Sequence, residues 1–185
     1  MARIYTRTGD DGTTGVVGGK RISKDSPLIG AIGSLDELNA LIGVVRSNDL
    51  PPKVDRVLQL VQNHLVVIGT EIATPEGTAQ RGRGIGEEDV KALEGEIDAL
   101  ECDLIPLKQF ILPGGTRAAA ELHLVRAVAR RTERECVALS RLEKVFPQIL
   151  CYFNRLSDLC FVLARWVNQN HSVPELQPSP SKPKD

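Results

Sequence analysis

Apolar residues recur at alternating steps of three and four positions from residue 26 to about residue 170. This spacing lines one face of an α-helix, and it occurs in five separate segments. The apolar positions run from Leu28 to Val45, from Val54 to Ile72, from Val90 to Leu104, from Leu122 to Leu139 and from Ile149 to Val167. Alternation with a period of two extends over only a few residues. We therefore predict an all-α fold, an antiparallel five-helix bundle over residues 26–172 with helices of about 18 to 25 residues.

Residues typical of helix ends flank these segments. Ser26 precedes Pro27, a combination that suits a helix cap and the first helical position. Pro51-Pro52 separates the first two segments, three acids at 87–89 suit the positive N-terminal end of the third, and Pro147 opens the fifth.

Three segments lack the helical pattern. Residues 1–25 are polar and rich in glycine, and we assign them to a separate N-terminal segment. Residues 74–86 are expected to form a flexible connector. Residues 173–185 contain four prolines and few apolar residues, so they are expected to form a flexible tail.

The composition narrows the function classes. Of 185 residues, 42% are hydrophobic but only 4% are aromatic, so the core must be aliphatic, which disfavours a β-sandwich. A net charge of −1 argues against nucleic-acid or membrane-surface binding, and no apolar run approaches the roughly 18 residues of a membrane span. The first residues do not resemble a signal peptide, and the four cysteines form no C-x-x-C pair. We expect reduced thiols and a cytoplasmic location.

The run Thr6–Gly15 is the first candidate site. Its glycines and threonines let backbone N–H groups approach an anion, an arrangement that binds phosphate, and Lys20 and Arg21 follow as cations. A solvent-exposed loop of ordinary turns is the alternative. A P-loop is excluded because Thr14 stands where its first glycine is needed and Arg21 follows the lysine.

A second candidate lies on the fourth predicted helix. Arg126, Arg130 and Arg134 recur every four residues and so share one face. Such a cluster of like charges is favourable if polyphosphate or partner carboxylates neutralise it, because arginine binds phosphate in a bidentate manner. A solvated face with Arg–Glu pairs is the alternative.

Two further segments are weaker signals. Phe110 precedes Pro113-Gly114-Gly115, and the aromatic ring either serves a site or forms a hydrophobic staple at the entry to the fourth helix. Asn154 lies on a polar face of the fifth helix. The three histidines have no histidine or cysteine at i+3 or i+4 and no Glu-x-x-His pair is present, so we assign no dedicated metal-ligand set.

Five pieces of the chain together resemble the PduO-type ATP:cob(I)alamin adenosyltransferases. They are TRTGDDGTTG at 6–15, GSLDELNA at 33–40, FILPGG at 110–115, RAVARRTER at 126–134 and NRLSDLCFVLAR at 154–165. The resemblance implies an enzyme that moves the 5′-deoxyadenosyl group of ATP to the cobalt of cob(I)alamin and releases triphosphate. It also implies a homotrimer of five-helix bundles that binds ATP and corrinoid between subunits, with Mg²⁺ carried on the ATP phosphates and a flavoprotein reductase as partner.

The same resemblance assigns residue roles. The ATP-binding residues would be Thr6, Arg7, Thr8, Gly9, Asp10, Gly12, Thr13, Thr14 and Lys20 in a structured N-terminal nucleotide loop, with Arg130, Glu133, Arg134 and Asn154 from a neighbouring subunit. Phe110 would bind cobalamin from below the corrin, displacing the lower axial base, and it joins Arg130 and Lys20 as the catalytic set. Asp36 would pair with Arg126 across the subunit interface.

A different class of protein fits the loop and the arginines equally well. A non-enzymatic trimeric bundle that binds ATP as a regulatory ligand would retain both, but it has no use for Phe110 in an apolar approach. A corrin-sized pocket beside the ATP site would discriminate between the two hypotheses.

Overall fold

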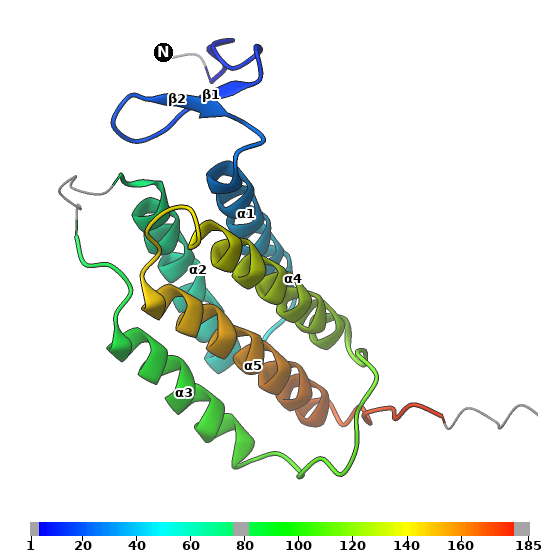
Figure 1. Cartoon of the computed structure of the whole chain (residues 1–185). Coiled ribbons are helices and arrows are strands. Elements are labelled where there is room, and N and C mark those ends of the chain that lie inside the picture. Colours follow the sequence, from blue (N-terminus) through cyan, green and yellow to red (C-terminus); the bar gives the residue numbers. More distant parts are fainter. Residues whose placement is uncertain (1–3, 76–81, 180–185) are drawn as a thin grey trace, which may run out of the picture.

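A computed structural model describes residues 4–75 and 82–179 (Figure 1). Its helices are α1 (Pro27–Arg46), α2 (Pro52–Ala73), α3 (Glu87–Glu101), α4 (Arg117–Leu139) and α5 (Pro147–Asn170). Two short strands, β1 (Thr13–Gly15) and β2 (Arg21–Ser23), pair in antiparallel register. The all-α prediction is therefore confirmed, and the N-terminal segment adds only this small ribbon.

The helix boundaries follow the local sequence. The Ser26 hydroxyl accepts a hydrogen bond from the backbone N–H of Ile29 at 3.4 Å, and Pro27 occupies the first turn of α1. The predicted starts at Glu87 and Pro147 are also confirmed. The predicted length is wrong for α3, which has 15 residues. Leu104 lies beyond its end, because an apolar side chain in the following turn packs against the core and extends the pattern.

The helices bury an aliphatic core. Helix α4 packs against both α1 and α5, while α2 covers α1 and α3 covers α5. The largest fully buried side chains include Tyr152 and Phe153 on α5 together with leucines and isoleucines of all five helices. The arrangement leaves a cavity between α3, α4 and α5.

Helix α1 alone, among the described residues, is long and apolar enough to cross a membrane by length and composition. Its most apolar window has a mean hydropathy of 1.6. In the sequence, two charged residues, Asp36 and Glu37, interrupt this apolar run. One such helix is weak evidence, since bundle helices of soluble proteins pass the same test.

The segments outside the helices are partly described. The ribbon lies beyond the N-terminal end of α1 (Figure 1). Parts of the predicted N-terminal segment (1–3), connector (76–81) and tail (180–185) lie outside the described residues. Residues 173–179 of the predicted tail have no regular structure. Several of them nevertheless contact the rest of the chain, and Glu175 pairs with the buried Arg165.

Candidate functional site

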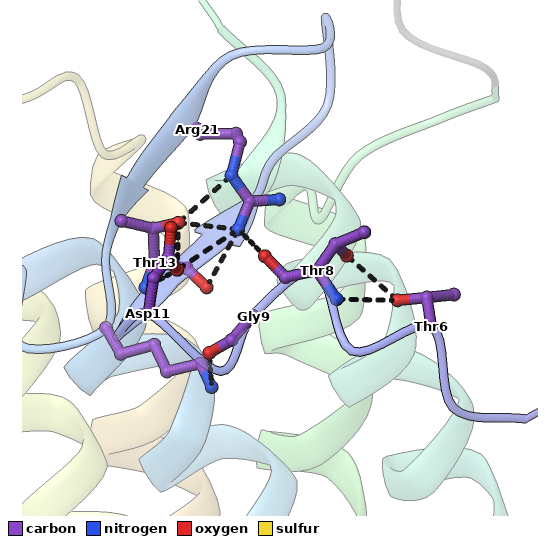
Figure 2. Close-up of polar contacts among 7 residues, drawn as sticks. Thr6, Thr8, Gly9, Asp11, Thr13 and Arg21 are labelled. Carbon is purple, nitrogen blue, oxygen red and sulfur yellow. Dashed lines mark hydrogen bonds and ion pairs between the residues drawn. The ribbon is translucent and has the colours of Figure 1, made fainter.

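The N-terminal loop is ordered around the guanidinium of Arg21 (Figure 2). Its Nε donates to the Thr13 hydroxyl at 3.0 Å, and its Nη2 donates to the same hydroxyl at 2.5 Å and to the carbonyl of Thr8. Asp11 lies 3.6 Å from the same Nη2. Arg21 of β2 thus holds the loop that precedes β1 by its hydrogen bonds to Thr8 and Thr13.

Two further side chains complete the loop. The Asp11 carboxylate accepts from the Thr13 backbone N–H at 2.9 Å and from its hydroxyl at 2.7 Å, and these bonds lower the pKa of Asp11. Lys24 Nζ donates to the Gly9 carbonyl at 2.7 Å. Gly12 adopts a φ of 83°, a conformation that glycine reaches without strain. From the sequence, Arg21 is predicted only as a nearby cation, and no sequence pattern identifies Asp11 and Lys24 as residues that organise the loop.

The other predicted loop residues lie mostly at the surface. Thr6, Arg7, Thr8 and Asp10 are exposed, as is Lys20, which directly precedes β2. Gly9 and Thr14 are half-buried, as is Thr13, whose hydroxyl is already used by Asp11 and Arg21. The loop therefore presents an ordered polar surface to solvent, and Thr13 contributes by holding its shape.

The predicted arginine face divides into two sites. Arg130 and Arg134 line a hollow of about 370 Å³ on α4 together with Glu133 and Arg141. Arg134 Nη1 donates to the Arg130 carbonyl at 3.0 Å. Glu133 receives Asn154 Nδ2 from α5 at 3.5 Å, so the structure brings these two predicted residues together.

Arg126 belongs to the second of these sites. Its guanidinium lies over the Phe161 ring, 5.5 Å from the centroid, and it lines a cavity of about 1100 Å³. Arg131, by contrast, pairs with Glu37 of α1, so the solvated-face alternative describes that arginine. Asp36 is exposed on α1, and no hydrogen bond or ion pair joins it to Arg126 within the described protomer.

The larger cavity lies between α3, α4, α5 and the loop that leads into α4. Its walls include Phe110, Phe161, Ile97 and Val162, and charged groups such as Asp158 lie at its margin. Phe110 is 87% exposed in the protomer. A hydrophobic staple would bury this ring, so the staple alternative is wrong.

The entry to α4 is fixed by Asn168 of α5 instead. Its Nδ2 donates to the Gly114 carbonyl at 2.9 Å, and its Oδ1 accepts from the Thr116 N–H at 2.9 Å. Gly115 has a φ of 103°, and a Cβ there would lie 2.2 Å from Asn168 Oδ1. Glycine at position 115 therefore allows the buried Asn168 amide to approach the backbone. Asn168, and not the Phe110 ring, holds the start of α4 in place.

The electrostatics of the large cavity are mixed. Burial lowers the pKa of His123, with Arg126 acting in the same direction, and in the described residues its Nε2 is buried without a hydrogen-bond partner. Arg155 binds Glu94 at 2.9 Å and Asp158 at 3.3 Å along the rim. Within residues 4–75 and 82–179, no group of three or more histidine, cysteine, aspartate or glutamate side chains is placed to hold a metal ion.

A large cavity with aromatic walls and an arginine-lined hollow thus share helix α4. The pattern of the cobalamin adenosyltransferase family matches residues 4–167. This chain belongs to that family. The chain is 42% identical to the corrinoid adenosyltransferase of Citrobacter freundii over 89% of its own length and 94% of the relative's. It is 39% identical to the corrinoid adenosyltransferase of Bacillus subtilis over 95% and 91% of the two chains.

Solved structures agree. A PduO-type ATP:corrinoid adenosyltransferase from Lactobacillus reuteri, a variant with one phenylalanine replaced by alanine in complex with cobalamin and ATP, superposes with a TM-score of 0.88 and 34% identity. The match covers 94% of this chain and 98% of that one. A variant of the same kind of enzyme with an arginine replaced by lysine, in complex with ATP, gives a TM-score of 0.89 at 34% identity over 95% and 100% of the two chains.

The family decides between the two function classes considered from the sequence. The chain is an adenosyltransferase, an enzyme that moves the adenosyl group of ATP to a corrinoid, and it is not a regulatory ATP-binding bundle. Phe161 is a cavity residue that the sequence analysis did not assign. Its signal was an aromatic residue beside the apolar face of the fifth helix in a chain with only four phenylalanines.

Proposed function

We propose that the chain joins the 5′-deoxyadenosyl group of ATP to the cobalt of cob(I)alamin in a site that forms between subunits. The observation that carries this proposal is the pairing on α4 of a cavity of about 1100 Å³ with a separate hollow lined by Arg130 and Arg134. The cavity suits a large, largely apolar ring, and the hollow suits a polyphosphate.

The reaction places few chemical demands on the protein. The cobalt of cob(I)alamin supplies an electron pair that forms the Co–C5′ bond, while the C5′–O bond breaks and triphosphate leaves with that bond's electrons. No proton has to be removed from the nucleophile. The enzyme must align C5′ with cobalt and stabilise the leaving triphosphate, which are tasks of orientation and electrostatics.

The residues fit these tasks. Arg130 and Arg134 would bind the triphosphate, Glu133 and Asn154 would orient the nucleotide, and Lys20 would bring a further cation. Mg²⁺ would be held by the phosphate oxygens, since oxygen ligands of this kind are what it prefers. The loop residues Thr6, Arg7, Thr8, Gly9, Asp10, Gly12 and Thr14 would line the nucleotide through their hydroxyls and backbone groups, over the frame that Arg21 holds.

A homotrimer would assemble the complete site. No hydrogen bond or ion pair within the described protomer joins the N-terminal loop to Arg130, Glu133 or Arg134, so a loop from one subunit and a hollow from the next would meet at an interface. Asp36, exposed on α1, and Arg126 would form an ion pair across that interface. The pair would also place an intersubunit contact at the edge of the large cavity, because Arg126 covers Phe161.

Phe110 would act on the cobalt. An exposed ring at the cavity would exclude the lower axial base of cobalamin by its bulk. Loss of that ligand makes Co(II) easier to reduce, so a flavoprotein reductase would supply the electron to a cobalt already held by this enzyme. We also propose a cytoplasmic location, which the four free cysteines of the chain support.

The test mixes the purified chain with ATP, Mg²⁺ and chemically reduced cobalamin and follows the absorbance of the cobalt–carbon product. Arg130→Ala should weaken ATP binding by roughly ten- to a hundredfold, the effect of losing a charge-assisted hydrogen bond. Arg56→Ala on the exposed surface of α2 is the matched control and should leave binding unchanged. No product with the unaltered chain, or equal ATP affinity in both variants, would refute the proposal.

A further inference from the structure

The loop between α3 and α4, residues 102–116, carries Phe110 but has no regular secondary structure of its own. The Phe110 ring buries little of its surface, so packing of the ring cannot hold it in place. The position of this ring must therefore be fixed through the loop backbone. Contacts from α5 and from residues 173–177, here called the C-terminal strap, supply that restraint.

Arg165 of α5 is the centre of these contacts. Its side chain is buried, and its Nε and Nη2 donate to the two carboxylate oxygens of Glu175 at 2.9 and 3.2 Å. The same Nη2 donates to the carbonyl of Ile105 at 2.7 Å. One guanidinium thus joins the helix, the strap and the loop, and neutralises a carboxylate that burial would otherwise disfavour.

The strap also binds the loop on both sides of Phe110. The Leu112 backbone N–H donates to the Leu176 carbonyl at 2.7 Å, and the side chains of Gln109 and Gln177 form a hydrogen bond. One contact precedes Phe110 by a single residue and the other follows it by two, so the strap holds the chain on both sides of the ring.

The start of the loop is attached to α5 independently of the strap. Trp166 Nε1 donates to the Asp103 carboxylate at 3.2 Å, and Gln169 Nε2 donates to the Asp103 carbonyl at 2.5 Å. Asn168 secures the other end at Gly114. Both ends are therefore anchored without the strap, and only the segment that carries Phe110 depends on it.

We propose that the C-terminal strap holds Phe110 at the corrinoid cavity, with Arg165 and Glu175 as positioning residues for the transfer reaction. The proposal rests on the proposed role of Phe110 in excluding the lower ligand of cobalt. It assigns a role to Arg165, which is buried on α5, and to residues 173–177, which the sequence assigns to a flexible tail.

Two truncations separate the strap from the rest of the tail. A chain that ends at Pro174 lacks Glu175, Leu176 and Gln177, whereas a chain that ends at Ser179 keeps every strap contact and serves as the matched control. Amide hydrogen exchange over residues 105–112 should accelerate roughly tenfold or more in the first chain, the effect of losing charge-assisted and backbone hydrogen bonds. It should stay unchanged in the control, and Glu175→Gln should show an intermediate acceleration.

The functional measurement asks whether the strap acts through Phe110. Ending the chain at Pro174 should lower turnover that begins from Co(II) roughly tenfold, with a smaller loss from pre-reduced Co(I) and unchanged ATP affinity. In a Phe110→Ala background the same truncation should cause no further loss, because residues that act as a unit are not additive. Emission of Trp166, the single tryptophan, should stay unchanged because its contact with Asp103 lies outside the strap.

Three results would overturn the proposal. They are unchanged exchange over residues 105–112, a full additional loss of turnover in the Phe110→Ala background, and a loss of ATP affinity equal to the loss of turnover. The exchange experiment uses no corrinoid, so it tests the restraint by itself. If the full-length chain formed no adenosylated product, the proposed function would fail, while accelerated exchange would still show that the strap restrains the loop.

Discussion

Replacing Phe110 with alanine should remove function without removing stability. The ring is 87% exposed in the protomer, so truncation sacrifices little buried area. The buried part is about 13% of a phenylalanine surface of roughly 200 Å². At about 25 cal/mol per Å², removing the ring should lower the free energy of unfolding by about 0.5–1 kcal/mol. For a domain of this size, that loss shifts the melting midpoint by about 1–4 °C.

The matched control is the phenylalanine that the core buries completely. Phe153 on α5 has 0% exposure, and even the mild change Phe153→Leu should cost about 1–2 kcal/mol through lost packing. Thermal unfolding of the two variants should therefore rank Phe153→Leu as the less stable, although it alters the smaller fraction of its side chain.

The cobalt assay should give the opposite ranking. Electron paramagnetic resonance of Co(II) with ATP bound should lose its four-coordinate signal in Phe110→Ala and keep it in Phe153→Leu. Turnover from Co(II) should fall sharply in the first variant, with a smaller fall from pre-reduced Co(I). Identical spectra for the unaltered chain and Phe110→Ala would refute the assignment, as would a melting midpoint lowered more than that of Phe153→Leu.

Three further perturbations test the loop, the interface and the titrating core. Arg21→Lys keeps the charge but loses the forked contact with Thr13, so ATP affinity measured by calorimetry should fall roughly tenfold with little change in melting midpoint. Asp36→Ala should weaken the proposed trimer by about 3–5 kcal/mol, and combining it with Arg126→Ala should add little; a monomeric unaltered chain in light scattering would contradict this. Burial lowers the pKa of His64 on α2; Asp89 opposes this shift and Arg83 adds to it. The unfolded chain therefore binds the proton at a higher pH than the folded chain, so the free energy of unfolding should fall as the pH drops below about 6.5, and it should fall less in His64→Asn.

Most of the fold could be predicted because the bundle depends on repeated, local signals. Apolar residues at helical spacing identified all five helices, and the cap at Ser26 and the proline at 147 placed two of their starts. Leu104 extends the apolar pattern beyond α3 because periodicity follows burial, and a partly buried side chain in a turn looks like one more helical position. After α3 the backbone continues in turns, in which the N–H of Asp103 donates to the Leu100 carbonyl and that of Leu104 to the Glu101 carbonyl.

The candidate site was predictable only as a set of segments. Sequence identified the N-terminal loop, the arginines of α4 and Phe110, but it could not show that Arg21 folds the loop, because that contact joins residues eight or more positions apart through a guanidinium fork. The tail was assigned by its prolines. Proline content predicts that the segment is not helical, but it cannot show that Glu175 pairs with the buried Arg165 of α5.

The division of the arginine face has a consequence for the reaction. Arg126 and Arg134 are eight residues apart on one continuous helix, which separates them by about 12 Å along its axis. Arg126 lines the large cavity and Arg134 lines the hollow, so with the corrinoid and the triphosphate bound as proposed, α4 would fix the spacing between the two substrates. Because α4 packs against both α1 and α5, this spacing would change little, and the transfer distance would be set before either substrate binds. The rigid part of the alignment would therefore reside in α4, while the Phe110 loop and the N-terminal loop, held by Arg165 and Arg21, would complete the site around the substrates.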